Sequence, residues 1–429
     1  MFEPTGSRRD AASVIINLPG YGVIDAVDLP LGGRRIKVLP VDLESGCPTC
    51  GVVSSRVHAW TEQQVRDVPH AGRVQVVVRK PRLVCAEPAC PRRTFTPATD
   101  QLPLRARCTT RLRMALLGAV IDSGRAVAEV AADVAVAWWT VQATVNAAAV
   151  MLPNIDELHV RRLGIDEHRY RRVRWFRDDQ GSWQRVEPWM STIVNADCGQ
   201  VLGIVDGRDS AAVGAGLAQR SQGWRDRIEI VAIDPSAPFR KAIREQLPNA
   251  LVSVDGFHLV QLANLMVTRV RQRLIRERED RRGRKIDPAW ANRRLLLRGY
   301  DTLSPRAQTR LDYVFATDDP TDELSAAWGV KEQLRRLLKI QTVEHARHEK
   351  MILGCYVLAA DMEETWRLWA TIEAWWPAIE VLIEHRVTNA RTEAANTSIK
   401  QIKRTGRGYR NPAHYRARIL LTSAARRAA

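Results

Sequence analysis

Residues 228–261, IEIVAIDPSAPFRKAIREQLPNALVSVDGFHLVQ, contain two short apolar runs, each ending in an aspartate and followed by a helical pattern. The first run ends at Asp234 and the second at Asp255. This order predicts two buried strands that alternate with helices, as in an α/β fold. Functional sites of open α/β sheets gather at the carboxyl ends of the strands. The stretch therefore predicts both the fold class and the region of the site.

The flanking sequence extends this unit in both directions. Upstream, residues 160–172 (VRRLGIDEHRYRR) are expected to form a strand that carries Asp166 and Glu167, and residues 188–207 a hairpin that turns at 197–199. Three strands joined by hairpins and followed by two strand–helix units predict a mixed sheet with helices on its faces. Downstream, residues 266–380 are expected to be mostly helical, with the four tryptophans of residues 364–384 in the core.

The charge of the chain indicates a polyanionic partner. Its 429 residues include 65 Lys and Arg against 48 Asp and Glu, which gives a net charge of +17 and a pI of about 10.1. Nucleic acid is the commonest such partner, and an anionic membrane is the alternative. No apolar run approaches the roughly 20 residues that span a bilayer, and the first residues lack the layout of a signal peptide. We therefore expect a cytoplasmic protein.

Seven cysteines are present, and four of them form two close pairs, Cys47-x2-Cys50 and Cys85-x4-Cys90. Two ligands from each of two tight turns suit tetrahedral thiolate coordination, so the spacing predicts a structural Zn²⁺. Four thiolates leave no open position for catalysis. The alternative is a set of four buried free cysteines.

Residues 100–152 are expected to be helical and to contain a helix-turn-helix. Its first helix is placed at 126–134, its turn at 135–137, and its second helix from Trp138 onward. Such a second helix enters the major groove in many DNA-binding proteins, and an ordinary helical hairpin is the alternative. The candidates for DNA contact are Trp139, Thr140 and Gln142, although the two tryptophans fit a scaffold better than base readers. The last eight residues, TSAARRAA, are expected to be a frayed tail.

Residues 386–427 contain eleven Lys or Arg and a single acid, Glu393. Phosphodiester chemistry on DNA needs two divalent ions held by carboxylates from separate elements. Asp166, Asp234 and Glu393 are the candidates, and a surface ion pair is the alternative for Glu393. The cations expected to hold phosphates, unless they form a solvated helix face, are Lys400, Lys403, Arg404, Arg407 and Arg410.

Several polar side chains remain as supporting candidates. Asp255 with His258 could be an accessory pair or the cap of a helix, and Asp255 is also an alternative to Asp234 as the second acid. Asn389 and Asn396 are expected to orient Glu393 or to cap the local turn. Glu167 and His168 could support the acids from nearby.

These motifs resemble those of a DDE-type bacterial insertion-sequence transposase, in the family written ISL-three. The motifs are CPTC, CAEPAC, GIDEHRYRR, the stretch from Val231 to Gln261, and TNARTEAANTSIKQIKRTGRGYRN. The resemblance covers nearly the whole chain. It implies an RNase H-like mixed sheet interrupted by an all-helical insertion, which explains why 68 residues separate Asp166 from Asp234 and 159 separate Asp234 from Glu393. In such a sheet the fourth strand lies beside the first, which favours Asp234 over Asp255.

The resemblance also implies a function and an order of domains. The function is cleavage of double-stranded DNA at terminal inverted repeats and transfer into target DNA, with two Mg²⁺ (or Mn²⁺) and at least a homodimer in the synapse, at the bacterial nucleoid. The alternatives are a DNA-binding regulator with a degenerate core and a structure-selective nuclease. The expected segments are a zinc-binding domain (1–99), the helix-turn-helix (100–152), the first part of the catalytic core (155–265), the helical insertion (266–380) and the last part of the core (381–425).

Overall fold

The computed structural model describes residues 10–30, 32–70 and 72–428. The chain forms two compact units, one made by the described residues of Met1–Leu152 and Ile402–Ala429, the other by Pro153–Gln401. The expected last segment, 381–425, is thus divided between them. The start of the expected zinc-binding segment, 1–9, lies outside the described residues.

The first unit begins with helix α1 (Ala11–Ile16) and a sheet in the order β1-β2-β6-β5. Its strands are β1 (Tyr21–Asp28), β2 (Arg34–Pro40), β5 (Val57–Arg66) and β6 (Val74–Val84), and β7 (Thr94–Phe95) pairs with β6. The small hairpin of β3 (Ser45–Gly46) and β4 (Val53–Ser54) encloses the first cysteine pair.

Four helices complete this unit: α2 (Thr110–Ile121), α3 (Val127–Asp133), α4 (Trp138–Val150) and α16 (Pro412–Ala428). The positions predicted for the helix-turn-helix are confirmed, but helix does not extend over residues 100–109. The frayed tail is a wrong prediction. α16 extends to Ala428, and Ala425 packs against an apolar cluster of α2, α3 and α4, because α16 presents an apolar face to them.

The second unit is built on the mixed sheet β12-β11-β8-β13-β14. Its strands are β8 (Arg162–Arg169), β11 (Trp189–Asn195), β12 (Val201–Asp206), β13 (Ile230–Ile233) and β14 (Leu251–Val254). β8, β13 and β14 run parallel, whereas β11 is antiparallel to both of its neighbours. In chain order β8 is the first strand of this sheet and β13 is the fourth. The two lie side by side, as an RNase H-like sheet requires.

Alternation along β8 separates the two faces of this sheet. Leu163 and Ile165 are fully buried in a cluster that includes residues of helices α5 (Ser210–Ala218) and α7 (Ala237–Gln246). Gly164 faces the other way, toward helix α15 (Ala390–Thr405). Asp166, two residues further along, shares the face of Gly164.

Between β8 and β11 the chain makes a separate two-stranded hairpin of β9 (Arg174–Arg177) and β10 (Trp183–Val186). The sequence pattern does not predict this hairpin. Short helices η1 (Ile155–Glu157) and α6 (Gln222–Asp226) complete this part of the unit.

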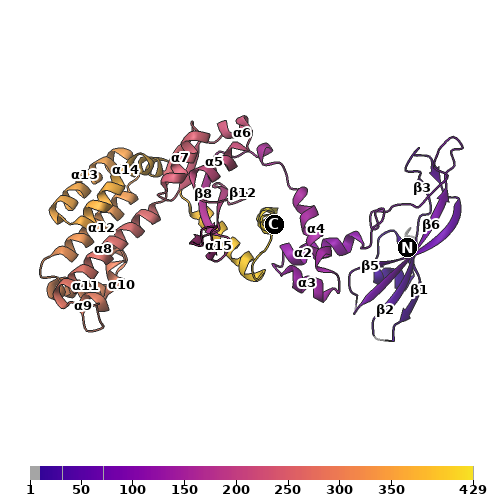
Figure 1. Ribbon diagram of the computed structural model, residues 1–429, viewed down its shortest axis with the longest axis horizontal. Helices are drawn as coiled ribbons and strands as arrows, with labels where there is room; N and C mark the ends of the chain where they lie inside the picture. The colour runs from indigo at the N-terminus through magenta and orange to yellow at the C-terminus, as the bar shows by residue number, and fades with distance from the viewer. Residues whose placement is uncertain (1–9, 31, 71, 429) are drawn as a thin grey trace, which may run out of the picture. The chain divides into compact units, whose positions relative to one another are not determined.

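The insertion is helical, as predicted, and its long helices α8, α12, α13 and α14 pack side by side (Figure 1). Its helices are α8 (Gly256–Glu279), α9 (Pro288–Ala291), α10 (Arg293–Leu296), η2 (Tyr300–Thr302), α11 (Pro305–Asp318), α12 (Glu323–Lys339), α13 (Val343–Ala360) and α14 (Glu363–His385). None of the helices within the described residues is long and apolar enough to cross a membrane.

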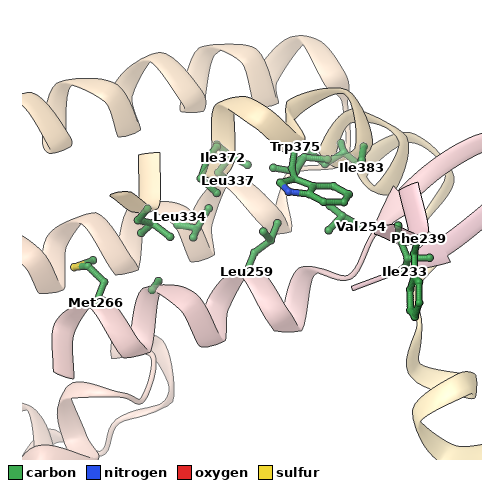
Figure 2. Close-up of a cluster of buried hydrophobic side chains, with 14 of the residues drawn as sticks. Ile233, Phe239, Val254, Leu259, Met266, Leu334, Leu337, Ile372, Trp375 and Ile383 are labelled. Atoms are coloured by element: carbon green, nitrogen blue, oxygen red, sulfur yellow. The ribbon is translucent and has the colours of Figure 1, made fainter. Parts of the chain in front are cut away.

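One apolar core joins the insertion to the sheet. Figure 2 shows Trp375 of α14 and Leu259 of α8 in the same cluster as Val254 of β14 and Ile233 of β13. Of the four tryptophans expected in the core, Trp375 is buried, whereas Trp366 is 40% exposed. The shared core holds α14 on the sheet, and α14 leads directly into α15.

The contact between α15 and β8 depends on the missing side chain of Gly164. A Cβ atom built at Gly164 would lie 1.9 Å from Oγ1 of Thr392 and 3.0 Å from Oδ1 of Asn389. Real Cβ atoms do not approach other atoms so closely, so any larger residue would push α15 away from the sheet.

We predict that Gly164→Ala destabilises the protein by about 1–3 kcal/mol, the usual cost of overpacking a close contact. The measurement is urea unfolding followed by circular dichroism. Gly203→Ala in β12 is the matched control, because a Cβ there meets nothing within 4 Å. Adding Thr392→Ala should recover part of the loss, and equal stability of both glycine variants would contradict the close packing.

Candidate active site and zinc site

Carboxylates from three elements gather at one end of the sheet. Ile165 of β8 pairs with Ile233 of the parallel strand β13. Asp166 and Asp234 are the next residues after this pair, so the two aspartates lie side by side. Glu393 comes from the first turn of α15. His258, in the first turn of α8, lies with Nε2 3.0 Å from Oδ2 of Asp234 and Nδ1 3.8 Å from Oε1 of Glu393. The histidine therefore links two of the three acids.

Two amide side chains position the aspartates. Nδ2 of Asn389 donates to Oδ1 of Asp234 at 3.0 Å, and Nδ2 of Asn396 donates to Oδ2 of Asp166 at 2.7 Å. Spacings of four and three residues place both amides on the side of α15 that carries Glu393. The expectation that these amides orient Glu393 is not met, because their donors point to the aspartates instead.

Behind Asn396 a chain of buried hydrogen bonds runs from α15 through β11 to β8. Its Oδ1 accepts from Oγ1 of Thr192 at 2.8 Å, and the same hydroxyl lies 2.9 Å from Nδ1 of His168. All three side chains are buried. His168 thus supports Asp166 through Thr192 and Asn396. The bond from Thr192 fixes the side-chain amide of Asn396 in one orientation.

Asp255 is engaged by the backbone. Its Oδ1 accepts from the N–H of Phe257 at 2.7 Å and caps α8, while its Oδ2 accepts from the N–H of Asn389 at 2.9 Å. The side chain is buried. Nevertheless, ligand atoms of Asp255, His258 and Glu393 lie within 4.8 Å of one another, a spacing that a metal ion could bridge.

Burial and neighbouring carboxylates raise the pKa of two acids in this region. Burial raises the pKa of Asp234 to about 6, and the carboxylates of Asp166 and Asp255 add to this, against the lowering effects of Asn389 and His258. Burial, with the charge of Asp166, also raises the pKa of Glu167, whose carboxylate lies 3.5 Å from Arg208. A cation bound among these groups would relieve the repulsion.

The four paired cysteines come together in the first unit. Sγ of Cys47 lies 4.0 Å from Sγ of Cys90, and Sγ of Cys50 lies 3.5 Å from Sγ of Cys85, with all four atoms within 4.8 Å of one another. Zn–S bonds of about 2.3 Å in a tetrahedron place sulfurs about 3.8 Å apart. The donor set therefore fits one tetrahedral Zn²⁺.

The residues expected at the helix-turn-helix surface divide into two groups. Trp139 is 66% exposed and Thr140 is half-buried, so both are accessible. Gln142, by contrast, is buried and donates to Oδ1 of Asn146 at 2.8 Å. The ring of Trp139 lies against Trp138 and His414 of α16.

The basic residues of α15 and the segment after it are largely accessible. Arg407 lies 3.7 Å from Glu129 of α3, and Lys403 is half-buried. The fully exposed members of the set are Lys400, Arg404, Arg407 and Arg410.

Two family models match this chain. Residues 163–419 match the ISL3 model, which is described as a transposase. Residues 44–90 match the zinc finger of the transposases of IS204, IS1001, IS1096 and IS1165. The first match spans more than half of the chain and includes every side chain of the acidic site.

Individual proteins are similar over long stretches. The transposase for insertion sequence element IS1001 of Bordetella parapertussis is 26% identical over 406 residues, which cover 93% of this chain and 94% of that protein. The transposase for IS1557 of Mycobacterium tuberculosis is 25% identical over 319 residues, 68% and 67% of the two chains. The Drosophila P element transposase strand transfer complex aligns with 65% of this chain and 80% of that one, at a TM-score of 0.34 and 8% identity, values too low to indicate a shared fold.

We predict that the purified protein contains about one zinc ion per chain, measured by plasma mass spectrometry. Cys90→Ser should lose the metal and lower the melting temperature of the protein, because a structural zinc contributes directly to folding. Cys355→Ser is the control, since that thiol is exposed on α13 and lies outside the cluster. Full zinc content in Cys90→Ser would contradict the assignment.

We also predict that Asp234→Asn stabilises the metal-free protein at pH 7 by about 1–2 kcal/mol, a value reduced for partial solvent screening. The folded pKa of about 6 exceeds the ordinary 3.8, so this carboxyl destabilises the fold increasingly as pH rises from about 4 to about 6. The gain should therefore vanish below pH 4. The measurement is chemical unfolding in the presence of a chelator, with Asp312→Asn, at an exposed position, as the control. A lower stability of Asp234→Asn than of wild type at pH 7 would refute the prediction.

Proposed function

Since the chain belongs to the ISL3 family of transposases, we propose that Asp166, Asp234 and Glu393 hold the two divalent ions with which it cuts and joins DNA strands. The observation that carries this proposal is that Asp166 lies on the strand beside that of Asp234, while His258 lies 3.0 Å from Asp234 and 3.8 Å from Glu393. Divalent ions bound there supply Lewis acidity to the attacking and leaving oxygens of a phosphodiester.

The donor set fits Mg²⁺ or Mn²⁺. Both ions prefer carboxylate oxygens and keep open positions for phosphate and water. Burial raises the pKa of Asp234, with the charge of Asp166 adding to it, and a cation bound at the carboxylate would offset both effects. Within the described residues, Nδ1 of His258 is buried without a hydrogen-bond partner, and its 3.8 Å distance to Glu393 leaves that carboxylate able to turn toward an ion.

Asp234 is a better second ligand than Asp255. Both oxygens of Asp255 accept backbone N–H bonds that begin α8 and hold Asn389, so this side chain has a structural role that a metal ion would have to share. Asp234 accepts one amide bond at Oδ1 and turns Oδ2 toward His258. Asn389 and Asn396 restrict the rotation of the two aspartates and so hold both carboxylates in a defined orientation in the site.

The remaining elements supply DNA binding. In this proposal the zinc domain and the helix-turn-helix recognise terminal inverted repeats, with Trp139 and Thr140 as accessible contacts. Lys400, Lys403, Arg404, Arg407 and Arg410 hold phosphates of the bound DNA. Because transposition joins two element ends, the active assembly is at least a homodimer.

The test is cleavage of a labelled duplex that carries the element's own terminal inverted repeat, with Mg²⁺ or Mn²⁺. We predict that Glu393→Gln lowers the rate at least about a hundred-fold, since a lost metal ligand removes several kcal/mol of transition-state stabilisation. Glu245→Gln, at an exposed position of α7, is the matched control and should cut normally.

Three outcomes distinguish the functions. Cleavage by wild type and Glu245→Gln alone supports the proposal. Equal cleavage by Glu393→Gln refutes the role of Glu393. Specific binding by all three proteins without cleavage by any of them indicates a DNA-binding regulator.

A further inference from the structure

The β9–β10 hairpin leaves the sheet at the end where the acids gather. It follows the carboxyl end of β8, eight residues after Asp166, and returns into β11. A hydrogen bond from the N–H of Tyr170 to the carbonyl of Pro188, at 2.8 Å, closes its base. The ribbon thus begins at the end of the sheet where the acids gather.

The base of this hairpin is a fixed structure. The indole of Trp189 lies between two guanidinium groups, Arg208 at 4.3 Å and Arg169 at 4.8 Å from the ring centre. Its Nε1 donates to Glu187 at 2.8 Å. Arg208 in turn lies 3.5 Å from Glu167, the neighbour of Asp166. The ribbon is therefore held in a defined position relative to the acids.

Aromatic and basic side chains alternate on one face of the ribbon. Trp175 pairs with Arg185, and Arg177 pairs with Trp183, across the two strands. Directly paired residues of an antiparallel hairpin share a face, so these four side chains form one surface. The guanidinium of Arg177 lies 5.1 Å from the ring centre of Trp183, in agreement with this placement.

The aromatic rings on this ribbon are exposed to an unusual degree. Trp175 is 56% exposed, Trp183 is 60% exposed, and Phe176 on the opposite face is 49% exposed. An isolated two-stranded hairpin is only marginally stable in water. Large aromatic side chains on both of its faces indicate that a binding partner covers it.

The charge of the ribbon identifies the partner. Residues 171–186 contain five arginines and two acids. One of the acids, Asp178, is used inside the turn, where it accepts from the N–H groups of Gln180 and Ser182. A second copy of this ribbon would repel it, whereas a nucleic acid strand satisfies both the cations and the rings. Exposed bases stack on aromatic side chains, and phosphates bind arginine.

We propose that the β9–β10 hairpin binds the DNA end during cleavage, with Trp175 and Trp183 stacking on bases that have left the duplex beside the scissile phosphate. Arg177, on the same face as the two rings, holds the backbone of the same strand. The inference rests on the proposed function and deepens it, because it assigns to this ribbon the unpaired bases of the substrate.

The experiment places 2-aminopurine, a fluorescent base quenched by stacking, at each of the last positions of the terminal repeat. Binding of wild-type protein in chelator should change the fluorescence at one or two positions, and Trp175→Ala with Trp183→Ala should abolish that change. The cleavage rate of the double variant should fall about 10- to 100-fold. Tyr313→Ala, which removes an exposed ring from α11, is the matched control.

A second substrate separates stacking from simple docking. An end with mismatched, already unpaired bases should recover most of the lost rate if the ribbon stabilises unpaired bases. Trp175→Leu keeps an apolar side chain without a stacking surface and should behave as Trp175→Ala does, whereas Trp175→Phe should retain activity. Circular dichroism verifies the fold of each variant.

Unchanged fluorescence and unchanged cleavage in the double variant would overturn the inference. Loss of self-association in light scattering, with the fluorescence change intact, would assign the ribbon to a second copy of the chain and also overturn it. If wild type binds the end but does not cut it, the proposed function fails, and the fluorescence of the bound end still decides the role of the hairpin.

Discussion

The close packing of α15 on β8 is the contact on which the acidic site depends. Gly164 allows the helix to approach the strand, and the absence of its side chain brings Asn389 and Asn396 within hydrogen-bonding distance of the two aspartates. A shift of the helix by the width of one methyl group would break both amide bonds and displace Glu393. A single glycine in the strand therefore sets the geometry of three acids that are distant in sequence.

The helical insertion serves the same contact from a distance. Its helices share one core with the sheet, and Trp375 lies in the same cluster as Val254 of the sheet. Because close-packed interiors transmit displacement, the insertion behaves as part of the scaffold of the site. Asp234 and Glu393 are far apart in sequence, but α14 packs on the sheet immediately before α15 begins. The position of Glu393 relative to Asp234 is therefore well defined.

The parts of this arrangement that local patterns encode could be predicted from the sequence. Apolar runs ending in aspartates predicted the strands that precede Asp234 and Asp255. The paired cysteines predicted the four-cysteine cluster. The interaction of Asn396 with Asp166 could not be predicted, because it joins residues 230 positions apart. Gln142 was assigned to the wrong side of its helix, since an almost wholly apolar helix offers little amphipathic signal. The β9–β10 hairpin was missed because its exposed aromatic residues lack the alternation of a half-buried strand.

A chain with a net charge of +17 nevertheless concentrates carboxylates where its phosphodiester substrate is proposed to bind. Burial and mutual repulsion raise the pKa of Asp234, so this cluster opposes folding in the absence of cations. The rigid surroundings of Gly164, Asn389 and the shared core keep the acids together despite that cost. The same repulsion between the carboxylates would favour the binding of the divalent cations that we propose for this site.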